Sequence, residues 1–185
     1  MYLEEGTFQI YHITSYQKGI LFLYESSYKP ISAENKKEAL QLNVKTEQSS
    51  FIEPVSQCIQ EAEQLDLWNP VAIYHGTDMI GFAMYGFFPY EDTHGRVWLD
   101  RFLIDNRYQG KGYGKAALKL LITRLFCEYQ CNTIYLSLYQ QNKHAYHLYT
   151  SFGFQENGEK DVNGETVMCL QKNHESVRQL NEISG

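Results

Sequence analysis

Cysteine is scarce in this chain, and no two cysteines have a metal-binding or redox spacing. The four cysteines, Cys58, Cys127, Cys131 and Cys169, include no Cys-x-x-Cys pair, which argues against a zinc site and favours a reducing compartment. The sequence also shows no cleavable leader and no apolar run long enough to span a bilayer. We therefore expect a cytoplasmic protein with no metal and no membrane partner.

Positive charge is scarce too, because 16 Lys and Arg stand against 22 Asp and Glu, for a net charge of −6. Nucleic-acid-binding proteins usually carry a basic face, so no nucleic-acid partner is expected, and cationic partners fit more easily. Internal repeats and low-complexity segments are absent. A length of 185 residues with 43% hydrophobic residues suits one well-buried domain.

A glycine-rich stretch follows a predicted buried strand and opens a predicted helix. Three glycines alternate there with two lysines and a tyrosine: Gly110, Lys111, Gly112, Tyr113, Gly114 and Lys115. Glycine permits positive φ, so such a turn can bring several N–H groups to one anion, with cations beside it. A pyrophosphate would fit. The turn lacks the Gly-Lys-Ser/Thr of a P-loop and the Gly-x-Gly-x-x-Gly of a dinucleotide-binding fold.

Taken alone, this stretch could also be an ordinary strand-to-helix turn that needs glycine. Its pattern Gln109-x-x-Gly112-x-Gly114 resembles the acetyl-CoA-binding signature of the GCN5-related N-acetyltransferases (GNATs), which reads Arg/Gln-x-x-Gly-x-Gly/Ala. Gln109 lacks the cation that many members of the family carry. Because pyrophosphate is bound mainly by backbone N–H groups, we expect cofactor binding to survive this difference.

A second segment, residues 142–154, matches the other signature of the same family, in which Asn, Ala, Tyr and Gly-Phe recur at these intervals. Alone, Asn142 would more often be a helix N-cap and Tyr149 a packed aromatic. Together with the glycine turn, the order of the two motifs favours the functional interpretation. The chain further resembles bacterial spermine/spermidine acetyltransferases over about residues 30–171, through the segments 51–53, 80–86, 95–102 and 163–165.

The resemblance implies an α/β (α+β) GNAT fold with a mixed central sheet of about seven strands, splayed between strands 4 and 5 and flanked by about four helices. The domain would cover residues 23–172, between an N-terminal extension of unknown role (1–22) and a polar C-terminal tail (173–185). Hydrophobic patterning and turn signals predict elements that agree with this fold. The strands are expected up to about residue 31, at 70–74, 79–88, 96–104 and 133–139 and twice within 155–170, and the helices at 36–42, 54–64, about 114–129 and before 153.

The resemblance also implies that acetyl-CoA binds in the splay, between the strand that ends at Ile104 and the strand that begins at Thr133. Pantetheine would pair with the backbone at Phe102 and Ile104, and a backbone N–H of this strand could stabilise the oxyanion. The residues expected to bind the cofactor are Phe102, Leu103, Ile104, Gln109, Gly110, Lys111, Gly112, Tyr113, Gly114, Lys115 and Asn142.

Two residues are candidates for acid–base chemistry. Asp100 stands where relatives that act on polyamines place an acidic residue, so it could be the base for the attacking amine, and it could equally be a carboxylate paired with a neighbouring Arg. Tyr149, carried over from the family motif, is the expected acid for the departing CoA thiolate.

Acidic residues predict a cationic substrate, and Glu53 is expected to lean over the substrate groove from the start of a helix. Glu61 and Glu63 are expected on a solvated helix face. The expected substrate-binding residues are Glu53, Tyr85, Glu91, Asp92 and Asp100.

The expected function is acetyl transfer from acetyl-CoA to a primary amine of a polyamine such as spermidine or spermine, by an enzyme whose partner is a small cationic amine. The alternatives are acetylation of a protein N-terminus, a lysine or an aminoglycoside, and a non-catalytic acyl-CoA sensor. A homodimer is compatible with the sequence.

Overall fold

The computed structural model describes residues 26–172, which form one seven-stranded sheet with four α-helices and one 3₁₀ helix. The expectations for residues 1–22 and 173–185 lie outside the described residues. In chain order the elements are β1 (Ser26–Pro30), α2 (Lys36–Ala39), η1 (Thr46–Gln48), α3 (Val55–Gln64), β2 (Trp68–His75), β3 (Asp78–Phe88), β4 (Arg96–Ile104), α4 (Tyr113–Glu128), β5 (Thr133–Leu138), α5 (Lys143–Ser151), β6 (Gln155–Lys160) and β7 (Thr166–Gln171).

The strands follow the order β1-β2-β3-β4-β5-β7-β6 across the sheet. Every neighbouring pair is antiparallel except β4 and β5, which run parallel and are joined through α4. A parallel crossover places the carboxyl ends of both strands at one edge of the sheet. The predicted mixed sheet is confirmed, and both motifs of the sequence lie at this edge.

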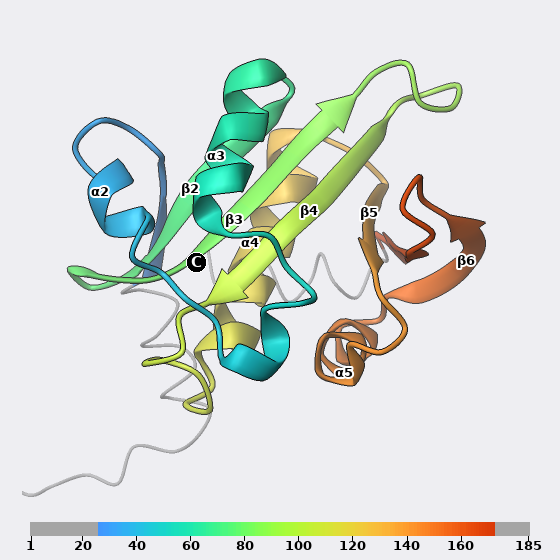
Figure 1. Ribbon diagram of the computed structural model, residues 1–185. Helices are drawn as coiled ribbons and strands as arrows, with labels where there is room; N and C mark the ends of the chain where they lie inside the picture. Colours follow the sequence, from blue (N-terminus) through green and yellow to red (C-terminus); the bar gives the residue numbers. More distant parts are fainter. Residues whose placement is uncertain (1–25, 173–185) are drawn as a thin grey trace, which may run out of the picture.

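The sheet opens between β4 and β5, as predicted. The two strands pair only at Val97↔Ile134 and Trp98↔Tyr135, close to their first residues. Beyond these pairs the strands diverge, which Figure 1 shows as the separation between the yellow-green β4 and the orange β5. The second half of β4 therefore has backbone groups facing the opening that no pairing with β5 uses.

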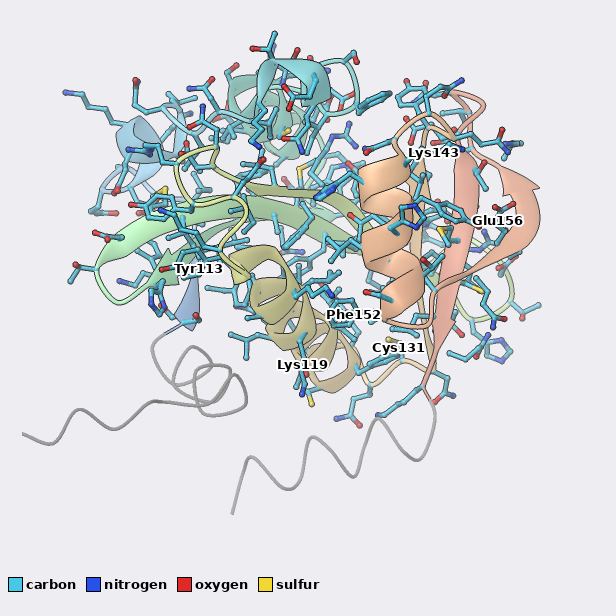
Figure 2. The ribbon with its side chains drawn as sticks, turned by 90° about the horizontal axis from the view of Figure 1, so that it is seen from below. Tyr113, Lys119, Cys131, Lys143, Phe152 and Glu156 are labelled. Carbon is cyan, nitrogen blue, oxygen red and sulfur yellow. The ribbon has the colours of Figure 1, made fainter. Side chains whose placement is uncertain are left out.

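Helices cover both faces of the sheet. Figure 2 shows α4 below the sheet and α3 above it, and α5 contributes Tyr149 to the core on the α4 side. On the α4 side the core is built from alternate residues of the central strands together with the apolar side of α4, including Leu118, Leu121 and Leu125. On the α3 side a smaller core surrounds Cys58, Ile59 and the ring of Phe82. The alternation of strand residues between two cores fixes which side chains of β4 face each helix layer.

A β-bulge changes this alternation in the middle of β4. The register steps from Met84↔Arg101 to Tyr85↔Leu99, so Asp100 has no partner residue on β3. Leu99 lies in the α4-side core, whereas Arg101 makes ion pairs on the α3 side. The bulge inserts one residue and re-aims the side chains that follow, as such bulges do.

Candidate active site

The glycine turn after β4 has the conformation expected of an anion-binding loop. Gly110 has φ +77° and Gly112 has φ +89°, and no heavy atom lies within 4 Å of the place where a Cβ would stand on either residue. Glycine is therefore required by backbone conformation and not by lack of space. Gly112 is the N-cap of the 16-residue helix α4, no side chain caps this end, and the first turn contains no acidic residue. The N-terminus of α4 thus suits a phosphate group.

The half-buried side chain of Gln109 stabilises this turn through two hydrogen bonds. Its Nε2 donates to the Ile104 carbonyl oxygen at 2.9 Å and to Gln48 Oε1 at 2.8 Å. Lys111 donates from Nζ to the Arg107 carbonyl oxygen at 2.9 Å, within the same turn. The side-chain amide at the motif's first position thus holds the shape of the loop.

The three predicted strand residues lie on the splayed half of β4. Leu103 and Ile104 are buried and face opposite cores, while Phe102 is half-buried against the α4-side core. On the helix that follows, Tyr113 packs with its ring centroid 6.0 Å from that of Tyr108. These side chains pack β4 into the cores on both faces of the sheet and hold the start of α4 against the preceding turn.

The second motif forms the start and the interior of α5. Asn142 is its N-cap, and the Asn142 Oδ1 accepts a hydrogen bond from the Ala145 N–H at 3.2 Å. The side chain of Tyr149 is buried and meets the ring of Phe154 edge-on, with centroids 5.6 Å apart. Burial raises the pKa of the Tyr149 phenol above its usual range, so the hydroxyl keeps its proton at neutral pH.

On the opposite face, Arg101 is surrounded by carboxylates. Its Nη1 lies 2.6 Å from Asp100 Oδ2, its Nε 2.7 Å from Glu53 Oε2 and its Nη2 3.6 Å from Glu61 Oε2. Nearby on β5, Ser137 Oγ lies 2.8 Å from Asp161 Oδ2 and 3.0 Å from Glu165 Oε2.

These five carboxylates form what we call the acidic cluster: Glu53, Glu61, Asp100, Asp161 and Glu165. Together with Arg101, which pairs with three of them, the five acids carry a formal charge of −4. Such a site attracts cations.

Two carboxylates of the acidic cluster, Asp100 and Glu165, have a raised pKa. Burial is the main cause that raises the pKa of Asp100 to about 6, Arg101 opposes it, and the negative charges of Glu61, Glu53 and Glu165 raise it further. Burial likewise raises the pKa of Glu165, with Asp161 adding to the effect and hydrogen bonds from Ser137 and Tyr139 opposing it. A carboxylate with a pKa near 6 is ionised at neutral pH yet accepts a proton more readily than a free Asp.

Three predicted substrate residues lie apart from this cluster. Tyr85 is 1% exposed in the α4-side core, and its hydroxyl donates to Glu128 Oε2 at 3.5 Å. Glu91 accepts a hydrogen bond from Trp98 Nε1 at 2.5 Å. Asp92, at φ 58°, pairs with Arg96 Nε at 2.5 Å. Arg96 also pairs with Glu159, through Nη1. Only Glu53 and Asp100 of the predicted substrate set meet in the acidic cluster.

The solvated-face prediction for α3 is wrong for one of its two glutamates. Glu63 is exposed and pairs with Lys36, whereas Glu61 turns toward Arg101. Sequence reasoning also missed Asp161 and Glu165 as site residues. The available signal was the hairpin turn at Asn163 and Gly164, which places the acids that flank it at the end of the sheet near the splay.

Two further kinds of site are absent from the part of the chain that the structure describes. None of the helices within residues 26–172 is long and apolar enough to cross a bilayer. Nor do three or more His, Cys, Asp or Glu side chains of these residues gather so that they could hold a metal ion.

Comparison with known proteins identifies the family. The acetyltransferase (GNAT) family model matches residues 37–154. The spermine/spermidine N(1)-acetyltransferase of Bacillus subtilis strain 168 is 50% identical over 143 residues, which cover 76% of this chain and 94% of the relative. A probable spermine N(1)-acetyltransferase of Bacillus subtilis subsp. natto is 49% identical over the same shares.

Solved structures show the same fold at low sequence identity. The spermidine N-acetyltransferase of Vibrio cholerae in complex with CoA and spermine has a TM-score of 0.62 at 17% identity and covers 80% of this chain and 96% of its own. An aminoglycoside N(6′)-acetyltransferase of Legionella pneumophila has a TM-score of 0.67 at 16% identity and covers 85% and 95%. With its glycine turn, its splayed parallel strands and these relatives, the chain belongs to the acetyltransferase (GNAT) family.

Proposed function

We propose that this protein transfers the acetyl group of acetyl-CoA to a primary amine of a polyamine such as spermidine or spermine. The observation that carries the proposal is the acidic cluster on the α3 side of the splay, where five carboxylates gather with a single Arg that pairs with three of them. A polyamine carries several ammonium groups along a flexible chain, so it can meet several of these carboxylates at once. A monoamine of the same length meets one.

The expected gain is a sum of modest terms. Glu53 and Glu61 are about one-third exposed, and ion pairs at such positions contribute only about 0.2–1 kcal/mol each and are screened by salt. Two or three ammonium contacts therefore add about 0.4–3 kcal/mol to binding. Selectivity for a polyamine follows from their number.

The sequence relatives support the polyamine assignment more directly than the fold does. Both Bacillus relatives carry spermine in their names at about 50% identity. The structural neighbours include enzymes for spermidine and for aminoglycosides with similar TM-scores, so the fold is shared by enzymes with different amines.

Acetyl-CoA fits the opening between β4 and β5, where it would supply an acetyl thioester. The open space around Gly110 and Gly112 and the uncapped start of α4 suit its pyrophosphate. The backbone of Phe102 and Ile104 on the unpaired half of β4 suits the pantetheine arm, and Asn142 stands at the start of α5, across the opening.

Asp100 is the proposed base, because it joins the acidic cluster to the bulged middle of β4. An alkylammonium with a pKa of about 10.4 lies about 3.4 units above neutral pH, so its neutral form costs about 4.6 kcal/mol. A carboxylate with a pKa of about 6 takes that proton directly or through a water molecule. Its ion pair with Arg101 at 2.6 Å keeps it in place.

Tyr149 is the proposed acid on the other side of the opening. Its buried phenol remains protonated at neutral pH, since burial raises its pKa. A phenol is intrinsically a weaker acid than a thiol, so its proton is expected to move as the C–S bond breaks and not afterwards.

A thiol-release assay with spermine, spermidine, a simple monoamine, an aminoglycoside and a peptide tests the substrate. We expect spermine to be preferred, with activity that falls as salt is added. Glu165→Gln should raise KM for spermine several-fold more than KM for the monoamine. Glu63→Gln is the matched control, because Glu63 lies on α3 but pairs with Lys36 outside the cluster.

Equal kcat/KM for spermine and the monoamine at all ionic strengths would refute the polyamine assignment and leave the family intact. The cytoplasmic location and the homodimer that the sequence allows stay predictions.

A further inference from the structure

Residues 43–53, called the bridging segment below, connect α2 to α3 and contact both substrate sites. Their only regular structure is the single 3₁₀ turn η1. The first half of the segment is bonded to the glycine turn, and the second half reaches the acidic cluster.

Three hydrogen bonds join the bridging segment to the residues that lead into the glycine turn. The Asn43 N–H donates to Asp105 Oδ2 at 3.0 Å, and the Asn106 N–H donates to the Asn43 carbonyl oxygen at 2.8 Å. Gln109 Nε2 donates to Gln48 Oε1 at 2.8 Å. The segment is thus held at two places, at Asp105 and Asn106 and again at Gln109.

Its second half belongs to the amine side. The ring centroid of Phe51 lies 6.4 Å from that of Tyr139 on the exit of β5, and Glu53 pairs with Arg101. The segment therefore reaches the glycine turn through Gln48 and the acidic cluster through Glu53.

Asp105 is a buried carboxylate that the proposed chemistry does not use. It is 2% exposed, and Oδ1 accepts from the Arg107 N–H at 3.0 Å and from Arg107 Nε at 2.7 Å, while Oδ2 accepts from Asn43. Burial alone would raise its pKa, but these hydrogen bonds outweigh burial and lower the pKa of Asp105. A buried charge is tolerated when it is fully bonded, and here the bonds fasten the segment to the turn.

The side chain of Gln48 links the bridging segment to the glycine turn. Its Oε1 accepts from the Lys45 N–H at 3.2 Å within the segment and from Gln109 Nε2 in the turn. Unlike a glycine of the turn, it can be replaced by Ala without changing the backbone that faces the phosphates.

We propose that Gln48 and Asp105 are positioning residues that couple the acetyl-CoA turn to the amine site through the bridging segment. CoA bound at the turn restrains the segment, and the restrained segment presents Glu53 to the amine, so the two ligands bind cooperatively. The identity of the amine rests on the proposed function, whereas the restraint of the segment by CoA does not.

Two measurements on the purified full chain test this coupling. In amide hydrogen exchange, CoA alone should slow exchange across residues 43–53 in the wild type and slow it much less in Gln48→Ala. In calorimetry, spermine affinity should rise at least about fivefold when CoA is present in the wild type, and less than about twofold in Gln48→Ala.

Gln171→Ala is the control, because the Gln171 Oε1 accepts from Thr133 Oγ1 at 3.1 Å at the far end of the sheet. It should keep the wild-type coupling. Asp105→Asn, measured beside its melting temperature, should lose coupling as well. If it does not fold, Gln48→Ala decides alone.

An exchange pattern and a coupling factor in Gln48→Ala equal to those of the wild type would overturn the inference. If spermine does not bind but CoA still protects residues 43–53 only when Gln48 is present, the polyamine proposal fails and the positioning role stands.

Discussion

Replacement of the two glycines that end the acetyl-CoA motif should have opposite consequences. At Gly112 the φ of +89° is left-handed, and nothing lies within 4 Å of a new Cβ. Gly112→Ala therefore causes no clash, but an alanine resists the left-handed backbone by about 1–2 kcal/mol. At Gly114 the backbone is helical, and the new Cβ would meet Ile104 Cγ1 at 3.7 Å, an ordinary contact.

The strain at residue 112 reduces either stability or affinity. If the turn keeps its shape, the cost lowers the free energy of unfolding; if the turn relaxes, CoA must restore the shape and binds about 5- to 30-fold more weakly. Gly114→Ala instead restricts the unfolded chain at a position where the folded chain accepts Ala, which favours folding by about 0.4–1 kcal/mol. This agrees with the family signature, which admits Gly or Ala there.

Calorimetry with CoA and thermal melting of both variants provide the test. Gly112→Ala should lose affinity, melting temperature or both, while Gly114→Ala should bind CoA within about twofold of the wild type. Equal losses in the two variants, or no loss in either, would refute the argument that φ, and not space, selects glycine in this turn.

Three further substitutions test the acid–base residues. Tyr149→Phe should lower kcat by about 10² with CoA affinity nearly intact, as measured by thiol release and calorimetry; full activity would remove Tyr149 from the mechanism. A base works only when deprotonated, so wild-type kcat/KM should fall as the pH drops through about 6, the pKa of Asp100. Asp100→Asn should be slow, and its kcat/KM should no longer show this fall at acid pH, which we call the acid limb. An unchanged acid limb would exclude Asp100 as the base. Arg101 lowers the pKa of Asp100, so Arg101→Gln should shift the acid limb above pH 6, and a limb that stays or moves down would contradict that electrostatic account.

The order of the sequence elements predicted much of the fold. The glycine turn and the spacing from Asn142 to Tyr149 placed one motif after each of two strands. The helix between those strands has an apolar face that packs on the sheet. The order strand, helix, strand therefore predicted two parallel neighbours, and β4 and β5 are parallel. These features are local in sequence, and the structure has them where the patterns indicate.

The side chains of the acidic cluster could not be placed in the same way. The bulge at Asp100 depends on the register of β4 against β3, which local patterning does not encode. If β4 alternated regularly through Asp100, Arg101 would share the side of Leu99 and face the α4-side core, and Glu61 would lack its cation. Almost every residue of β3 is buried, so no polar alternation shows that Tyr85 faces α4.

The partners of acidic residues in the loop before β4 could not be predicted from the sequence either. Glu91 and Asp92 looked free in the sequence, but each is bonded to a side chain of β4 only a few residues away, Trp98 and Arg96 respectively. Their charge is thus partly used within the loop and the start of the sheet. Exposed acids in a sequence predict a cationic partner only when the fold leaves them without an internal one.

Arg101 is the internal cationic partner of the acidic cluster. It is 18% exposed, so its charge is partly desolvated and needs carboxylates close by, and it pairs with three. Burial is the main cause that raises the pKa of Asp100 to about 6. One guanidinium cannot neutralise three acids, so the residual negative charge of Glu61 and Glu53 raises that pKa further. An incoming ammonium group relieves the same repulsion that Arg101 relieves in part. The geometry that holds the cluster together thereby attracts the substrate and prepares the carboxylate that takes its proton.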